Sequence, residues 1–226
     1  MNNVHHRLLS FGRRRGRRLC STKNDLISSL LEQLKIKNLE DIYRLNNEYQ
    51  EIHIEIGFGT GEFIANQAIA NPHIAFIGCE PFINGIANLL KLIQENNINN
   101  IRIWPDDARL LLEQLPTAFI HKIFILFPDP WPKLKHHKRR LVNDQLLLLL
   151  HNILKENASI LVATDHQEYA NCILEQFLSH PGFIHHTPNN GYTFPPDDWI
   201  KTKYHKRAES LNINSVFLTF YKINQI

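Results

Sequence analysis

Ile54-Glu55-Ile56-Gly57-Phe58-Gly59-Thr60-Gly61 is the stretch that decides the fold of this 226-residue chain. A short apolar run at residues 53–56 predicts a buried strand, and glycine follows it at every second position. Glycines with this spacing allow a tight turn and let a ligand lie against the backbone. The spacing differs from the Gly-x-Gly-x-x-Gly of dinucleotide enzymes, and it lacks the Gly-Lys-Ser/Thr of a triphosphate-binding loop.

Apolar runs typical of strands alternate with segments of helical spacing along the rest of the chain. This alternation predicts an α/β fold with a parallel sheet covered by helices on both faces. Ligands of such sheets bind at the carboxyl ends of the strands, so the residues directly after each strand are the informative ones. We expect strands at residues 53–56, 74–78, 101–104, 122–127, 159–163 and 215–222, and helices at 61–70, 86–95, 108–115, 142–154 and 167–179.

The organisation ahead of the glycine loop is a basic arm followed by helices. Residues 1–21 contain six arginines before Cys20 and no acidic residue, which predicts a flexible basic arm. A transit peptide has a similar composition, whereas a secretory signal would need an apolar core. We favour an arm that contacts nucleic acid, because further basic clusters follow. Residues 22–48 have helical spacing and form the beginning of a single domain at 22–226, within which we expect residues 189–198 to form a loop.

Carboxylates at three strand ends predict a nucleoside cofactor. Glu55, just before the glycine turn, would repel a phosphate but suits a ligand with an ammonium and a sulfonium. Glu80 follows the second strand, where an acid accepts hydrogen bonds from ribose hydroxyls. Asp107 follows the third strand and can meet an adenine amino group, although a helix cap is the alternative there. With the glycine loop, these acids indicate an S-adenosylmethionine site.

The fourth strand leads directly into Phe127-Pro128-Asp129-Pro130-Trp131-Pro132-Lys133. Three prolines restrict the backbone and remove donors, so the segment is rigid and non-helical. It lies where a substrate would meet the methyl group. Trp131 and Phe127 can stack on a base and Asp129 can bind its edge, whereas the alternative is a proline-rich turn around a buried tryptophan.

The net charge is only +3, but the basic residues are clustered. Separated basic clusters on a nearly neutral protein favour a polyanionic partner such as RNA, and solvated surface charge is the alternative. Besides the arm, the clusters are Lys133, Lys135, Lys138, Arg139 and Arg140, and Lys201, Lys203, Lys206 and Arg207.

Cysteine and histidine patterns suggest neither a disulfide framework nor a metal site. The three cysteines are far apart, which fits a reducing compartment, and we expect a cytoplasmic protein. The pairs His136-His137 and His185-His186 suit a loop or a surface better than a metal. No apolar run approaches the roughly 20 residues of a membrane helix.

From about Glu51 to Tyr221 the chain resembles the bacterial tRNA (guanine-N7-)-methyltransferases. The resemblance rests on the glycine loop, on Phe127-Pro-Asp-Pro-Trp-Pro-Lys with the basic residues after it, and on the segments Ala163-Thr-Asp165 and Thr202-Lys-Tyr204. It implies a Rossmann-like class I methyltransferase with a mostly parallel seven-stranded sheet, present as a monomer or homodimer. The implied reaction moves a methyl group from S-adenosylmethionine to N7 of guanine 46 in the variable loop of tRNA.

The resemblance also implies roles for individual residues. The cofactor would be bound by Glu55, Gly57, Gly59, Gly61, Glu80, Asp107 and Asp129, and Asp129 would also be the catalytic residue. The substrate would be bound by Lys133, Asp165, Thr202, Lys203, Tyr204 and His205, and the RNA contacted by Lys135, His136, His137, Lys138, Arg139 and Arg140. His205 departs from the family pattern, which has glutamate there, and Cys79 replaces an aliphatic residue before Glu80.

The chemistry of guanine defines what Asp129 can do. N7 carries a lone pair and no proton, so its methylation needs alignment rather than a general base. A carboxylate can accept the N1–H and N2 amino donors together and can stabilise the positive charge that develops on the purine. We therefore expect Asp129, with Asp165, to orient the base. The alternatives are a methyltransferase acting on protein or small molecules, and a non-catalytic RNA-binding protein of the same fold.

Overall fold

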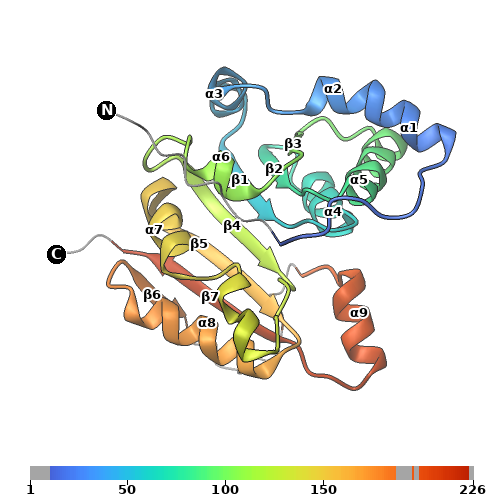
Figure 1. The fold of residues 1–226 in the computed structure, drawn as a ribbon. Helices are drawn as coiled ribbons and strands as arrows, with labels where there is room; N and C mark the ends of the chain where they lie inside the picture. Colours follow the sequence, from blue (N-terminus) through green and yellow to red (C-terminus); the bar gives the residue numbers. More distant parts are fainter. Residues whose placement is uncertain (1–10, 187–194, 196–198, 224–226) are drawn as a thin grey trace, which may run out of the picture.

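A computed structural model of the chain describes residues 11–186, 195 and 199–223. Within these residues, seven strands form one sheet in the order β3-β2-β1-β4-β5-β7-β6 (Figure 1). β7 runs antiparallel to both of its neighbours, and the other pairs are parallel. The strands are β1 (Glu51–Ile56), β2 (Ile74–Cys79), β3 (Ile101–Trp104), β4 (Ile120–Leu126), β5 (Leu154–Thr164), β6 (Phe183–His186) and β7 (Val216–Lys222).

Helices cover both faces of the sheet because alternate strand residues enter two separate cores. In β4, Ile123 and Ile125 face one core while Phe124 and Leu126 face the other. The first core is closed by α3 (Leu39–Glu48), α6 (Ala108–Leu112), α7 (Asp144–Ile153) and α8 (Gln167–Ser179). The second is closed by α1 (Ser21–Ser28), α2 (Leu30–Leu34), α4 (Glu62–Ala70) and α5 (Ile83–Asn96).

The predicted α/β fold with a mostly parallel sheet is confirmed. β3 and α8 have the expected bounds, and the other expected elements are present with ends shifted by several residues at most. The leucines at residues 146–150 lie in α7, which Asn143 caps by accepting a hydrogen bond from the Leu146 N–H at 3.0 Å. The expected loop at 189–198 lies outside the described residues except for Pro195.

Three elements were not expected from the sequence. They are β6, the 3₁₀ helix η1 (Leu134–Arg139) and α9 (Lys203–Ser210). His185 and His186 therefore lie in a strand rather than in a loop. β6 pairs with β7 at the edge of the sheet, and four residues are too few for their sequence pattern to predict a strand. η1 begins at Leu134, directly after the proline-rich segment, because the residues from there on have the backbone N–H groups that the prolines lack and can form a turn.

The part of the predicted arm that the structure describes, residues 11–20, leads into α1 without forming a helix or strand. It passes the N-terminal end of α5, where the Ile83 N–H donates to the Arg14 carbonyl at 3.1 Å. Figure 1 shows this segment running beneath α1 and α4 toward the middle of the sheet. The arm and the domain boundary at residue 22 stay predictions.

Candidate active site

The glycine loop between β1 and α4 has the backbone that its spacing predicts. Gly57, Gly59 and Gly61 have φ angles of +77°, +56° and +82°, which residues other than glycine rarely adopt. A Cβ on Gly61 would lie 2.7 Å from the Leu89 Cβ, so this glycine also allows α5 to pack closely. Nothing lies within 4 Å of a Cβ placed on Gly57, so that side of the turn faces open space.

Glu55 lies in β1 just before this turn and is almost completely buried. Its Oε2 atom accepts no hydrogen bond from any residue that the structure describes. Burial, with repulsion from Glu80 and Glu62, raises its pKa to about 8. A buried carboxyl oxygen that accepts no hydrogen bond is costly, and a cationic ligand group would provide the missing partner for Oε2.

Glu80 follows β2 and joins two loops through its carboxylate. Oε2 accepts from the Gly59 N–H at 2.8 Å, and Oε1 accepts from the Phe82 N–H at 2.9 Å. Burial raises its pKa, the two N–H groups oppose this shift, and Asp129 adds to it. Glu80 therefore lies near both the glycine loop and Asp129, which the sequence separates widely.

Asp107 performs the helix capping that was the alternative to cofactor binding. Its Oδ1 accepts from the Arg109 N–H at 3.0 Å, and its Oδ2 pairs with the Arg109 guanidinium at 2.8 Å. It also lies at the carboxyl end of β3, beside the loop that carries Glu80. Capping and ligand contact are compatible, so adenine binding by Asp107 stays a prediction.

The segment after β4 holds two bulky residues in an unfavourable backbone conformation. Phe127 and Trp131 have φ of +52° and +43°, a region that costs non-glycine residues energy. The Phe127 N–H donates to the Ala163 carbonyl at 2.7 Å, which attaches the segment to the end of β5. Strain that surrounding contacts maintain is common at functional sites, which favours a functional loop here.

Asp129 is exposed between these two strained residues. Its charge contributes to the raised pKa of both Glu80 and Tyr204, so it faces the cofactor side of the loop. Asp165, directly after β5, is half-buried at the same edge of the sheet. β4 and β5 are paired with Leu126 opposite Ala163, which brings the two acids to neighbouring loops.

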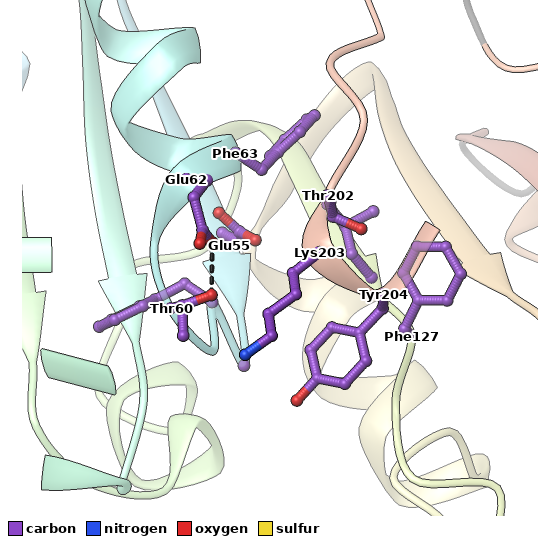
Figure 2. Close-up of a pocket in the computed structure, with 11 residues that line it drawn as sticks. Glu55, Thr60, Glu62, Phe63, Phe127, Thr202, Lys203 and Tyr204 are labelled. Carbon is purple, nitrogen blue, oxygen red and sulfur yellow. Dashed lines mark hydrogen bonds between the residues drawn. The ribbon is translucent and has the colours of Figure 1, made fainter. Parts of the chain in front are cut away.

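A pocket with about 300 Å³ of empty space separates the glycine loop from α9. Figure 2 shows Glu55, Thr60 and Glu62 on one side and Lys203, Tyr204 and Phe127 on the other. Lys203 reaches toward the glycine loop, and the Tyr204 ring stacks on Phe127 with centroids 6.2 Å apart. The pocket thus joins Glu55 and Gly57 of the predicted cofactor set to Thr202, Lys203 and Tyr204 of the predicted substrate set. Glu80, Asp107, Asp129 and Asp165 are not among the residues that line it.

Two of the predicted substrate residues have structural roles. Thr202 is buried and caps α9, its Oγ1 accepting from the His205 N–H at 3.0 Å. His205 is buried, accepts the Trp199 indole N–H on Nδ1 at 2.7 Å, and lies beneath Phe127 with centroids 6.3 Å apart. Burial lowers the pKa of His205. His205 therefore packs against Phe127, and substrate binding by Thr202 and His205 stays a prediction.

The basic residues after Trp131 differ in exposure. Lys133, Lys135 and Lys138 are exposed, whereas His136, His137 and Arg139 are half-buried. Trp131 is itself half-buried, since the Arg139 guanidinium lies 4.9 Å from its ring centroid and His136 contacts its edge. Trp131 is therefore only partly exposed, and its stacking on a base stays a prediction.

Arg140 is buried, unlike its basic neighbours. Its Nε donates to the Pro130 carbonyl at 2.9 Å, and Nη1 donates to Glu168 Oε1 at 3.1 Å. The guanidinium also lies over the Tyr169 ring. These contacts use N–H groups of the Arg140 guanidinium that a phosphate would need. We therefore expect Arg140 to position the acceptor loop instead of contacting RNA.

Sequence reasoning did not single out several residues of the site. The pocket is also lined by Phe58, Thr60, Glu62, Phe63 and Leu126. Thr60 and Glu62 are hydrogen-bonded to each other at the start of α4. A hydroxyl and an acid at the first turn after a glycine loop are the signal that would have identified them.

The residues present fit S-adenosylmethionine. Its ammonium suits Glu55 Oε2, which accepts no hydrogen bond from the described residues, and its ribose suits Glu80 at the end of β2. Within the described residues, no three His, Cys, Asp or Glu side chains gather as metal ligands. The same residues include no helix with the length and apolar character needed to span a bilayer.

Comparisons with known proteins show the family to which the chain belongs. A family described as "Putative methyltransferase" matches residues 49–218. A tRNA (guanine-N(7)-)-methyltransferase of Agrobacterium fabrum is 40% identical over 219 residues, 94% of each chain. Another, of Neorickettsia sennetsu, is 44% identical over 171 residues, covering 76% of this chain and 75% of its own.

Solved structures show the same fold at low sequence identity. The structure of the 16S rRNA methyltransferase KamB superposes with a TM-score of 0.60 at 15% identity. The match covers 83% of this chain and 94% of that one. The seven-stranded arrangement is therefore that of Rossmann-like methyltransferases.

Proposed function

Since this chain belongs to the tRNA (guanine-N7)-methyltransferase family, we propose that it methylates N7 of the variable-loop guanine of tRNA. Members of this family use S-adenosylmethionine, which supplies an electrophilic methyl group on a sulfonium. The observation that carries the proposal is the position of Asp129 in the loop after β4, which the pairing of Leu126 with Ala163 brings beside the loop of Asp165. The charge of Asp129 also contributes to the raised pKa of Glu80 and of Tyr204. A base bound by Asp129 is then adjacent to the ribose end of the cofactor site.

At the cofactor end, Glu55 binds the ammonium and Glu80 the ribose hydroxyls. The N–H groups of Gly59 and Phe82 donate hydrogen bonds to the Glu80 carboxylate and hold it in one orientation before any ligand binds. The glycine turn lets the ligand lie against the backbone at Gly57, where no side chain intrudes. Asp107 contributes to the adenine side while it caps α6.

At the acceptor end, Asp129 binds the guanine edge and stabilises the positive charge that develops on the ring. No residue needs to remove a proton, because N7 has none. Phe127 and Tyr204 provide aromatic surface beside the carboxylate, and their stacked rings are supported from below by His205. Asp165 and Lys203 complete the substrate side from neighbouring loops. The target base must leave its stack to enter this pocket.

The exposed lysines of η1 and its flanks bind the tRNA phosphates. Lys133, Lys135 and Lys138 have no ion-pair partner among the described residues, so their charge is available to RNA. All three cysteines are free, as suits the reducing cytoplasm where we expect the protein to act.

The test is incubation of the chain with labelled S-adenosylmethionine and unmodified tRNA, followed by digestion to nucleosides. The expected product is 7-methylguanosine. A tRNA whose variable-loop guanine is replaced by adenosine is the matched control and should remain unlabelled. Label in another nucleoside, or in protein without tRNA present, would contradict the proposal.

A further inference from the structure

Residues 11–17, which we call the strap, contact the loops that follow β2, β3 and β4. At the start of α5, which follows the β2 loop, the Gly16 N–H donates to Asn84 Oδ1 at 3.0 Å, and Asn84 Nδ2 donates to the Arg17 carbonyl at 2.8 Å. A Cβ on Gly16 would lie 2.8 Å from the Phe82 ring, so glycine allows this close approach. The strap is thereby attached two to four residues beyond Glu80.

At the β3 loop, the strap is anchored by one charged side chain. The Arg14 guanidinium pairs with Asp106 Oδ1 at 2.6 Å. The same oxygen accepts from the Asp107 N–H at 2.7 Å, so the ion pair is directly connected to the backbone of the candidate adenine residue. Movement of this loop and movement of the strap are therefore linked.

At the β4 loop, the strap is anchored by an aromatic side chain. Phe11 meets the Trp131 ring edge-on with centroids 6.3 Å apart. Arg139 completes a three-residue cluster, its guanidinium lying 5.0 Å from the Phe11 centroid and 4.9 Å from that of Trp131. Because Trp131 has φ of +43°, it keeps that conformation only while its surroundings hold it, and Phe11 is part of those surroundings.

The outward side of the strap is cationic. Arg13, Arg15 and Arg17 are exposed and have no ion-pair partner among the described residues. The contact between Phe11 and Arg139 joins these arginines to the exposed lysines around η1, so that the two groups form one cationic surface. Arg14 alone among these strap arginines is turned to an acid of the protein.

We propose that the strap couples tRNA binding to cofactor binding, with Arg14 and Phe11 as positioning residues. This inference rests on the proposed function. The cofactor contacts Glu80 and Asp107 and so stabilises the loop arrangement to which the strap attaches, while tRNA phosphates engage the outward arginines of the attached strap. Binding of either ligand then favours the attached strap, so the other ligand binds more tightly. The two effects on affinity are equal in size.

The experiment measures the dissociation constant of S-adenosylhomocysteine for the full chain, by calorimetry, with and without saturating tRNA. For the wild type we expect tRNA to tighten binding by roughly fivefold or more. In Arg14→Gln and in Phe11→Ala, the ratio should fall to within about twofold of unity. Phe11→Tyr keeps the aromatic contact and should keep the coupling.

Arg15→Gln is the matched control, because it removes the same charge from an unanchored neighbour. It should weaken tRNA binding and reduce its salt dependence, yet retain the wild-type coupling ratio. Loss of coupling in Arg15→Gln equal to that in Arg14→Gln would overturn the proposal, since general charge would then explain the effect.

The outcomes also separate this inference from the proposed function. A chain that forms 7-methylguanosine in tRNA but binds the two ligands independently contradicts the strap alone. A chain that neither binds nor methylates tRNA contradicts both. Coupling that survives in both Arg14→Gln and Phe11→Ala would show that the strap does not carry it.

Discussion

Glu55 and Asp129 are carboxylates in opposite environments, and this difference determines what each can do. Glu55 is buried without a hydrogen-bond partner for Oε2, so its charged form is unfavourable until a cation arrives. Asp129 is exposed on a strained loop, so it is accessible to an incoming base. One acid suits a resident ammonium, and the other suits a substrate that must enter and leave.

We expect Asp129→Ala to lower turnover by roughly 100-fold or more, the size typical of losing one transition-state electrostatic contact. Affinity for S-adenosylhomocysteine should change by less than about threefold, because Glu55 and Glu80 retain the cofactor contacts. Single-turnover methylation and calorimetry measure the two quantities. Complete loss of cofactor binding would show that Asp129 acts mainly on the cofactor.

Cofactor affinity should depend on pH through Glu55. Burial raises the pKa of Glu55 to about 8, so its carboxyl is protonated in the free protein at pH 6 to 7. The ligand ammonium favours the carboxylate, so binding releases a proton, and affinity rises by up to about tenfold per pH unit until it levels off near pH 8. Calorimetry in two buffers of different ionisation enthalpy measures the proton release.

Glu55→Gln is the control for that prediction, because the amide does not titrate. The variant should bind more weakly and show no proton release. The same shift affects folding with the opposite sign: Glu55 stabilises the free protein most below pH 4.5, and this contribution is lost as pH rises toward 8. A pH-independent affinity in the wild type would rule out the raised pKa.

At the scale of elements, η1 combines exposed and packed cations within six residues. Its exposed face carries Lys135 and Lys138, while Arg139 packs on Trp131. Arg140, directly after it, is buried and holds the Pro130 carbonyl and Glu168. A short helix that alternates exposed and packed cations can bind phosphate and still maintain the geometry of the acceptor loop.

Arg140→Ala and Lys138→Ala should therefore behave differently despite removing the same charge. We expect Arg140→Ala to lower the free energy of unfolding by about 2 kcal/mol, since it removes charge-assisted hydrogen bonds from a buried group. Lys138→Ala should leave stability within about 0.5 kcal/mol and weaken tRNA binding instead. Chemical denaturation and filter binding measure these effects. Equal destabilisation by the two changes would refute the assignment.

At the scale of the whole molecule, the distribution of charge matters more than its sum. The net charge is +3, yet the exposed cations of the strap and of η1 gather beside the acceptor loop. The carboxyl ends of β1, β2, β3 and β4 bring the acids of the cofactor site to the adjoining edge. The molecule thus presents a group of strand-end acids next to a cationic surface.

tRNA affinity should fall steeply with salt, whereas cofactor affinity should not. If five to eight exposed cations contact phosphates, the slope of log affinity against log salt is roughly −3 to −7. S-adenosylhomocysteine binding should show almost no slope, because its carboxylate contacts are local and partly buried. Titrations between low and moderate salt test both. A shallow slope for tRNA would contradict phosphate binding by these clusters.

The sequence by itself determined the α/β fold, because hydrophobic periodicity and glycine spacing are local patterns. It also indicated the strand-end acids Glu55, Glu80 and Asp107, since strand ends of a parallel sheet share one edge. The motif around Asp129 was evident because its prolines and aromatics are adjacent in the chain. These features need no knowledge of which distant residues touch.

Only the tertiary structure decided which residues are available. It placed His205 beneath Phe127, buried Arg140 against Pro130, and brought Phe11 to Trp131 across more than a hundred residues of chain. Exposure and partnership depend on packing between segments far apart in sequence, which periodicity does not encode. For that reason neighbouring cations that look alike in the sequence have different roles in the folded protein.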